Sequence, residues 1–337
     1  MDTTKMPQRP RFRLSSLRLR AVIWQALVVA VLVALGFWLV SNTLANLEMR
    51  RINSGFGFLQ RPAAIPIGET LIGYAPGDTN LRAIAVGLCN TLLVSVLGIV
   101  FATLIGVAVG VSRLSRNWLL ARLASIYVEY IRNVPLLAHL MVIYVVLQGL
   151  PPLRSALSLG GFAFLSNRGL VIPTLAIGDW WSVVTIALPR LDGLNFVGGH
   201  TLSPELTALL VGLALYSGAF IAEIVRGGIL AVPQGQWEAG YAVGLERRRV
   251  LRLIVMPQAL RLIIPPTTNQ YLDLAKSSSL AIAIGYPDLV AVINGVITNT
   301  GQAIECVALI MAAFLAINLS VSALMNLYNA RMRLAQR

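Results

Sequence analysis

The sequence predicts an all-α membrane protein with six transmembrane helices and with both termini on the inside of the membrane. The first observation is composition: the 337 residues are 57% hydrophobic and 12% charged, whereas soluble domains carry roughly 25% charged residues. The second is a mean hydropathy of +0.75, which leaves too little polar surface to face water on all sides. The third is that basic residues gather between the apolar segments.

Six apolar segments are long enough to cross roughly 30 Å of hydrocarbon as α-helices. They are 21–40, 85–111, 124–150, 204–230, a stretch within 257–285, and 303–328. A basic N-terminus precedes the first segment, as in a signal peptide, but this apolar run of about twenty residues is long for a signal core and no cleavage site follows closely. We therefore expect it to be retained as a helix. Pro265 and Pro266 are expected to break the fifth helix.

Residues 151–202 are expected to leave the hydrocarbon as an outer excursion. The part from 170 to 189 is apolar, but a proline, an aspartate and the pair Trp180–Trp181 interrupt it, and tryptophans favour the membrane–water interface. Whether this part crosses the membrane, lies on it or leaves it stays open from the sequence alone. We expect it to lie partly in the headgroup layer.

The basic residues predict the orientation. With the N-terminus inside, the inside segments hold 19 of the 27 lysines and arginines, the outside segments hold 7, and the last is Lys276 within a helix. Such clusters between spans give no basic face with base-stacking residues, so no nucleic-acid partner is expected. The chain divides into residues 1–82, with the basic tail, first helix and outer loop, and a membrane core at 83–337.

Enzyme and metal-site motifs are missing from the sequence. A phosphate-binding loop needs lysine after glycine, and neither Lys5 nor Lys276 follows one. Cys89 and Cys306 lie far apart in apolar segments. His139 and His200 have no histidine four residues away. We expect neither catalysis nor a metal, and no cofactor bound by this chain itself.

The strongest pattern lies in the inside loop 232–257, which contains EAGYAVGLERRRVLRLIVMP from Glu238 onward. Small residues at 239, 240 and 244 let another chain segment come close. Gly244 is expected to end a short helix in the left-handed conformation, and Pro257 to mark where the next helix begins. The alternative is a solvated loop with extended arginines, which explains the arginines but not the glycine spacing.

This loop resembles the EAA loop of ATP-binding-cassette importer permeases, whose pattern is Glu-Ala-Ala-x3-Gly-x9-Ile-x-Leu-Pro. The spacing matches at every step, and only Gly240 and Met256 differ in residue type. Segments 127–140, 218–239 and 265–289 resemble permeases for polar amino acids. Segments 156–173 and 198–206 resemble the outer part of permeases from general L-amino acid transport systems.

The resemblance implies a five-helix type I importer core with one added N-terminal helix, in the inner membrane of a bacterium. It also implies a second homologous permease subunit, a dimer of ATPase subunits that carries the ATP and Mg²⁺, and a periplasmic amino-acid-binding protein. The coupling loop would dock the ATPase. Its expected docking residues are Glu238, Ala239, Gly240 and Gly244, to which we add Arg247, Arg248 and Arg249 as contacts to an acidic rim.

Ionisable groups within membrane spans indicate function by default. The expected substrate path consists of Asn269, Gln270, Tyr271, Asp273, Lys276, Ser277 and Ser278. Asp273 and Lys276 are three residues apart, so a structural ion pair is the alternative to a polar cavity for a zwitterion. Two further pairs with this spacing are expected to act in gating or packing: Glu129 with Arg132, and Glu223 with Arg226.

Two other functions stay open from the sequence. An ion-gradient-driven transporter has similar hydropathy, although no inverted repeat is evident here. A membrane scaffold without a transport path would leave Asp273 and Lys276 with a purely structural role.

Overall fold

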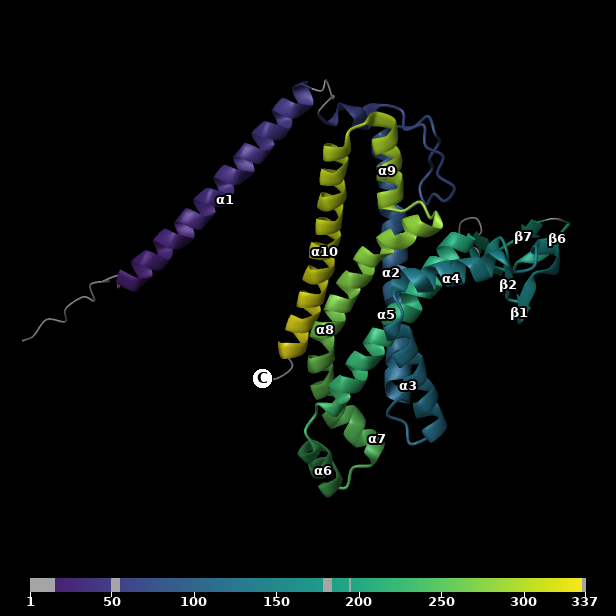
Figure 1. Ribbon diagram of the computed structural model, residues 1–337. Helices are drawn as coiled ribbons and strands as arrows, with labels where there is room; N and C mark the ends of the chain where they lie inside the picture. Colours follow the sequence, from purple (N-terminus) through teal and green to yellow (C-terminus); the bar gives the residue numbers. More distant parts are fainter. Residues whose placement is uncertain (1–15, 50–54, 178–183, 194, 335–337) are drawn as a thin grey trace, which may run out of the picture. The chain divides into compact units, whose positions relative to one another are not determined.

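The computed structural model of the chain describes residues 16–49, 55–177, 184–193 and 195–334 (Figure 1). Two compact units are present, one up to Gly55 and one from Phe56 onward. The outer loop from residue 56 thus packs on the membrane core, although the sequence grouped it with the first helix. Phe58 of this loop lies in one hydrophobic cluster with Leu289 and Ile293.

The first unit contains one long helix, α1 (Ser16–Met49). Within it, Arg20–Thr43 forms a span of 24 residues in which no residue is buried. A helix that is apolar all round needs an apolar environment on every side, and its length of about 36 Å suffices to cross a bilayer. The first predicted span is therefore confirmed as a helix.

The second unit is a helical bundle. Six helices of this unit correspond to the predicted spans: α2 (Asn80–Ser112), α3 (Trp118–Asn133), α4 (Leu136–Gln148), α5 (Pro204–Leu230), α8 (Met256–Ser277) and α10 (Ala303–Leu334). Within the described residues, five helices of the whole chain are long and apolar enough to cross a membrane, or six when α3 and α4 count as one span. The count agrees with the six predicted helices.

The third predicted span, 124–150, consists of two helices rather than one. The chain bends by 106° between α3 and α4. Pro135 lacks an N–H group, and its ring disfavours the α-conformation at the preceding residue. Val134 accordingly adopts an extended conformation, with φ −108° and ψ 134°.

The predicted break at Pro265 and Pro266 is also corrected, because α8 runs through both prolines. A proline ring fixes φ near the helical value, so a helix can continue through it, although the carbonyls four residues earlier lose their amide donors. Just after the prolines, the hydroxyls of Thr267 and Thr268 donate to the carbonyls of Ile263 and Ile264 at 2.7 and 2.9 Å. α8 instead changes into a 3-10 helix, η4 (Ser278–Ile284).

A further helix, α9 (Leu289–Thr300), was not predicted from the sequence. Gly285 ends η4 in the left-handed conformation with φ +82°. Asp288 then caps α9, because its carboxylate accepts from the Ala291 amide at 2.8 Å. With 12 residues, α9 is too short to be recognised as a span.

The outer excursion forms short antiparallel strands. β1, β2, β3 and β8 make one sheet in that order, whereas β4–β5 and β6–β7 are separate hairpins. The described part of 151–202 contains no helix of membrane length, and residues 178–183, with Trp180–Trp181, lie outside the described residues. The strands are Leu157–Leu159, Ala163–Ser166, Gly169–Ile172, Thr174–Ile177, Val184–Ala187, Arg190–Asp192, Asn195–Val197 and His200–Leu202.

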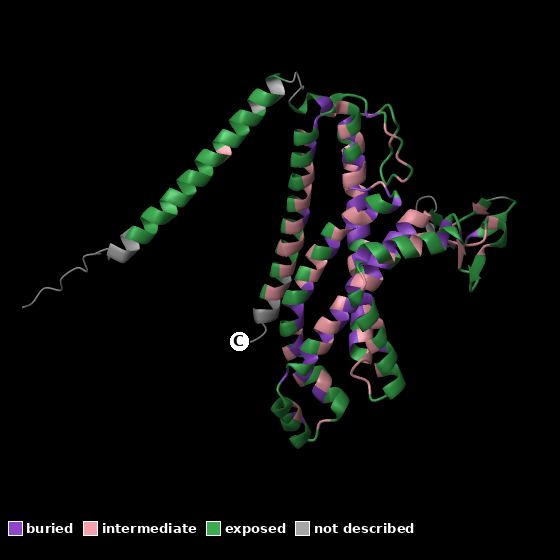
Figure 2. Ribbon diagram, viewed as in Figure 1, coloured by how far each residue is buried: buried purple, intermediate pink, exposed green. Residues whose placement is uncertain are grey.

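The core of the bundle is the contact between α2 and α5, where purple buried segments meet in Figure 2. Three small residues of α2 at every fourth position line this contact and are buried: Ala102, Gly106 and Gly110. A Cβ on Gly106 would lie 2.5 Å from Cγ2 of Ile221 on α5. Small residues at this spacing let two helix backbones approach closely, and van der Waals contact then holds them together.

We expect Gly106→Ala to destabilise the bundle by about 1 to 3 kcal/mol, because the added methyl group overpacks the contact with Ile221. Gly227→Ala on α5 is the matched control, since nothing lies within 4 Å of a Cβ there. The thermal unfolding midpoint of the purified chain in detergent is the measurement. Equal midpoints for the two variants would contradict the close approach.

Candidate functional site

The predicted coupling loop forms a helix–turn–helix at the end of α8 opposite α9 (Figure 1). Its helices are α6 (Gln234–Ala242) and α7 (Arg247–Val250), and a π-helical turn, η3 (Leu251–Val255), leads into α8. Gly244 has φ +78°, which confirms the predicted left-handed turn. The next helix begins at Met256, next to Pro257 as predicted.

Gly240 faces inward. It is buried, and a Cβ at this position would lie 2.8 Å from Cγ2 of Val250 and 3.0 Å from Cδ1 of Ile254. Its lack of a side chain therefore lets α6 pack on α7 and η3. The structure thus gives this predicted docking residue a packing role inside the element.

The other predicted docking residues face outward: Glu238, Ala239, Gly244, Arg247, Arg248 and Arg249 are exposed. No ion pair holds any of the three arginines in the described part of the chain. Val243 and Leu253 are 74% and 62% exposed beside them. Unpaired arginines next to exposed apolar side chains form a surface typical of a protein interface.

A hydrophobic cluster connects this element to the bundle. Val250 and Val255 share the cluster with Ala259 of α8 and with Ile221 and Val225 of α5. Ala102 of α2 belongs to the same cluster. Continuous packing therefore connects α7 and η3 with the α2–α5 contact.

Glu223 is the centre of a charged cluster near this end. Its carboxylate accepts from Nε of Arg226 at 3.1 Å, as the predicted spacing suggests. It also accepts from Nη1 of Arg113, which the sequence analysis did not single out. Nε of Arg113 donates to Ser125 Oγ at 3.3 Å. The cluster connects the C-terminal end of α2 with the middle of α3 and with α5, and the roles of Glu223 and Arg226 in gating or packing stay predictions.

The pair of Glu129 and Arg132 is not brought together. Both side chains are exposed, and the described residues show no ion pair between them. Arg132 instead lies over the ring of Phe220 on α5, 5.0 Å from its centroid, a cation–π contact between α3 and α5.

The predicted path residues divide between two sides of α8 and η4. Tyr271 turns toward the bundle, where its hydroxyl bonds to Thr103 Oγ1 of α2 at 2.8 Å. Ser278 is buried, whereas Gln270 and Ser277 are partly exposed.

Asn269, Asp273 and Lys276 form an exposed polar row on α8, at positions i, i+4 and i+7. Within the described residues, Asp273 and Lys276 form no ion pair with each other or with any other group. The structural ion pair considered above is therefore absent. Two unpaired charges on a membrane helix are costly in contact with lipid.

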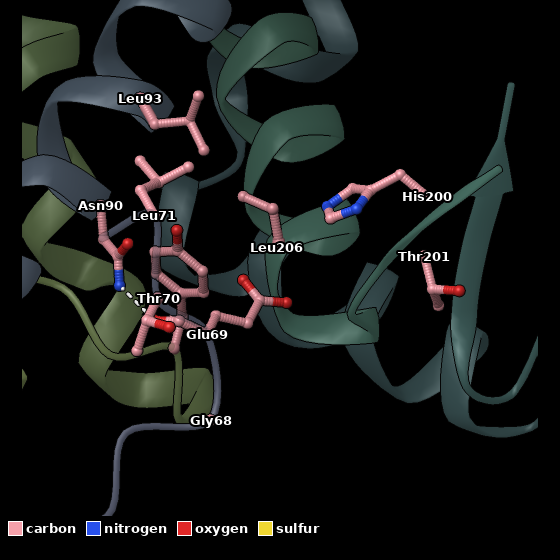
Figure 3. A pocket seen from close by; sticks show the side chains of 10 residues that line it. Gly68, Glu69, Thr70, Leu71, Asn90, Leu93, His200, Thr201 and Leu206 are labelled. Atoms are coloured by element: carbon pink, nitrogen blue, oxygen red, sulfur yellow. Dashed lines mark hydrogen bonds between the residues drawn. The ribbon is translucent and has the colours of Figure 1, made fainter. Parts of the chain in front are cut away.

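A separate cavity of about 280 Å³ is drawn in Figure 3, and no residue of α6, α7 or η3 lines it. Outer-loop residues 68–71, α2, β8, α5 and Tyr286 line it, and Glu69 and Asn90 supply polar groups. Burial, and after it the charges of Glu69 and Asp288, raise the pKa of the Tyr286 hydroxyl, so this group stays protonated. Sequence reasoning missed this cavity because its residues come from four separate segments.

Comparison with known proteins decides the family. The family described as binding-protein-dependent transport system inner membrane component matches residues 98–334. The chain belongs to this family of transport permeases. The match includes α5, the coupling element and α8 through α10.

Curated relatives of this permease carry amino-acid transport names. It is 43% identical to the putative amino-acid ABC transporter permease protein YhdX of Escherichia coli, over 94% of this chain and 95% of that protein. It is 39% identical to the general L-amino acid transport system permease protein AapQ of Rhizobium johnstonii, over 94% and 93% of the two chains. These matches confirm the assignment to amino-acid permeases of ATP-binding-cassette transporters.

A solved structure supports the fold. The permease resembles a chain in a crystal structure of an amino acid ABC transporter with histidines, at a TM-score of 0.55 and 25% identity. The match covers 74% of this chain and 94% of that chain.

We expect Glu223→Gln to destabilise the permease by about 1 to 3 kcal/mol. A neutral amide would replace the carboxylate, which accepts charge-assisted hydrogen bonds from Arg113 and Arg226. Glu129→Gln is the matched control at an exposed carboxylate outside this cluster, and a change within about 0.5 kcal/mol is expected there. Thermal unfolding in detergent measures both. Similar losses in both variants would show that the cluster does not join the three helices.

Proposed function

We propose that this chain is one membrane subunit of an ATP-driven importer of L-amino acids in the inner membrane of a bacterium. ATP hydrolysis in a partner ATPase, docked on α6 and α7, drives the bundle between outward and inward access. The observation that carries the proposal is the exposed helix–turn–helix with EAA spacing, because such an element fits a cleft in a soluble partner.

Docking would use the outward side of the element. Ala239 and the open turn at Gly244 offer small surfaces for close approach, and Glu238 adds a polar contact. Arg247, Arg248 and Arg249 would meet an acidic rim on the ATPase, because unpaired arginines favour carboxylate partners. ATP and Mg²⁺ belong to the partner, and this chain acts as a transport subunit rather than an enzyme.

The polar row on α8 would form part of the substrate path. A second, homologous permease subunit would cover Asn269, Asp273 and Lys276, because lipid is a poor neighbour for their charges. The enclosed space would then hold one acidic and one basic group from this chain. Such a pair suits an L-amino acid, because its ammonium and carboxylate groups would then each face an opposite charge.

The remaining partners follow from orientation. The basic residues favour placing α6 and α7 inside, with the N- and C-termini on the same side. The opposite end, with the outer loop and the strands of 151–202, would then receive a periplasmic amino-acid-binding protein. The name of the family that matches this chain supports such a partner.

We expect Gly240→Leu to abolish ATPase docking, because the added side chain would push α6 away from Val250 and Ile254. Gly235→Leu on the same helix is the matched control, since nothing lies within 4 Å of a Cβ there. Co-purification of the ATPase and ATP-driven amino-acid uptake in vesicles are the two measurements, with the membrane content of each variant as a check on insertion. Normal co-purification and uptake by Gly240→Leu would refute the coupling role of this element.

A further inference from the structure

The cavity near Glu69 has the size of a small-molecule site. Its volume of about 280 Å³ is close to the lower end of ligand pockets, roughly 300 Å³. Glu69 and Asn90 line it (Figure 3), as does Tyr286, and none of the path residues on α8 does. The cavity is therefore a separate feature from the proposed substrate path.

The walls of the cavity are held in place by buried groups. Asn90 is 1% exposed, and its Nδ2 donates to the carbonyls of Glu69 and Pro287, both at 2.9 Å. The amide of Ser203, the N-cap of α5, donates to Oε1 of Glu69 at 3.0 Å. The outer loop is thereby fixed to α2 and α5, so the site exists before any ligand arrives.

The lining has an acidic character within a basic protein. The chain carries 27 lysines and arginines, yet no lysine or arginine lines this cavity. Glu69 is half-buried, and no cation of the described residues forms an ion pair with it. Tyr286, 1% exposed, also lines the cavity, and its hydroxyl has no hydrogen-bond partner in the described structure. The site thus offers a carboxylate that lacks a positive partner.

Both apolar and polar side chains line the cavity. Leu71, Leu93 and Leu206 supply the apolar part. His200 on β8 points its ring toward the cavity from the side opposite Asn90 (Figure 3). This combination suits a small molecule with one ammonium group and an aliphatic part.

We propose that this cavity binds a small amino acid, with the Glu69 carboxylate as the counter-ion of its ammonium group. Hydrogen bonds between an ammonium group and a carboxylate are among the strong ones in proteins, and the leucines contact the aliphatic part. The proposal rests on the proposed amino-acid import. It adds a second binding site, at the end of the helical bundle opposite α6 and α7.

Three probe compounds show which charged group of the ligand the cavity recognises. L-alanine carries both charges, ethylamine only the ammonium group, and propionate only the carboxylate. Saturation-transfer NMR would measure their binding to the assembled transporter in nanodiscs without binding protein. L-alanine and ethylamine are expected to bind, and propionate is not.

Variants test the role of Glu69. Glu69→Gln keeps an oxygen that can accept the Ser203 amide but removes the charge, so ethylamine affinity is expected to fall about tenfold or more. Thr201→Trp, which fills the cavity from the exposed strand β8, is expected to abolish binding. Asp192→Asn is the control, because it makes the same charge change on an exposed hairpin outside the cavity.

Several outcomes would overturn the proposal. These are unchanged ethylamine affinity in Glu69→Gln, binding of propionate as tight as that of ethylamine, displacement of ethylamine by equimolar sodium, or no binding of any probe. ATP-driven amino-acid uptake is measured in parallel with the same purified transporter reconstituted into proteoliposomes, with the binding protein added outside. Its loss in the unmodified transporter would contradict the proposed import, whereas intact uptake with any of the outcomes above would reject the cavity proposal alone.

Discussion

The close contact between α2 and α5 is the constraint on which the rest of the structure depends. Because Gly106 and Gly110 carry no side chains, Ile221 and the backbone of Ala222 lie directly against α2. Lipid gives apolar helices no hydrophobic reason to associate, so such packing has to supply the attraction. The charged cluster at Glu223 then connects the C-terminal end of α2 with α5 and adds α3.

The coupling element is continuous with this core. Gly240 lets α6 rest on Val250, and Val250 belongs to the cluster that reaches Ile221 and Ala102. α8 carries the packing onward, because it passes through its two prolines without a break. Continuous packing therefore connects α7 and η3 with α8, the helix that carries the polar row, and the proposed ATP-driven change of access would act through these contacts.

Hydropathy predicted the spans because membrane length and apolar composition are local properties. The turn at Gly244 was predictable as well, since only glycine adopts that conformation without strain. The chain bends at Pro135 but continues as a helix through Pro265 and Pro266, so the presence of a proline did not by itself decide the outcome. Residues far apart in the chain form the contact of Arg113 with Glu223 and the cavity at Glu69, and no local pattern records such contacts.

The energy source of transport tests the central claim most directly. Proteoliposomes would contain this permease, its partner permease and the ATPase, with the binding protein and a radiolabelled L-amino acid added outside. The account predicts uptake that requires ATP inside and persists after sodium and proton gradients have been collapsed. Uptake by proteoliposomes that lack the ATPase, driven by a sodium or proton gradient, would contradict it.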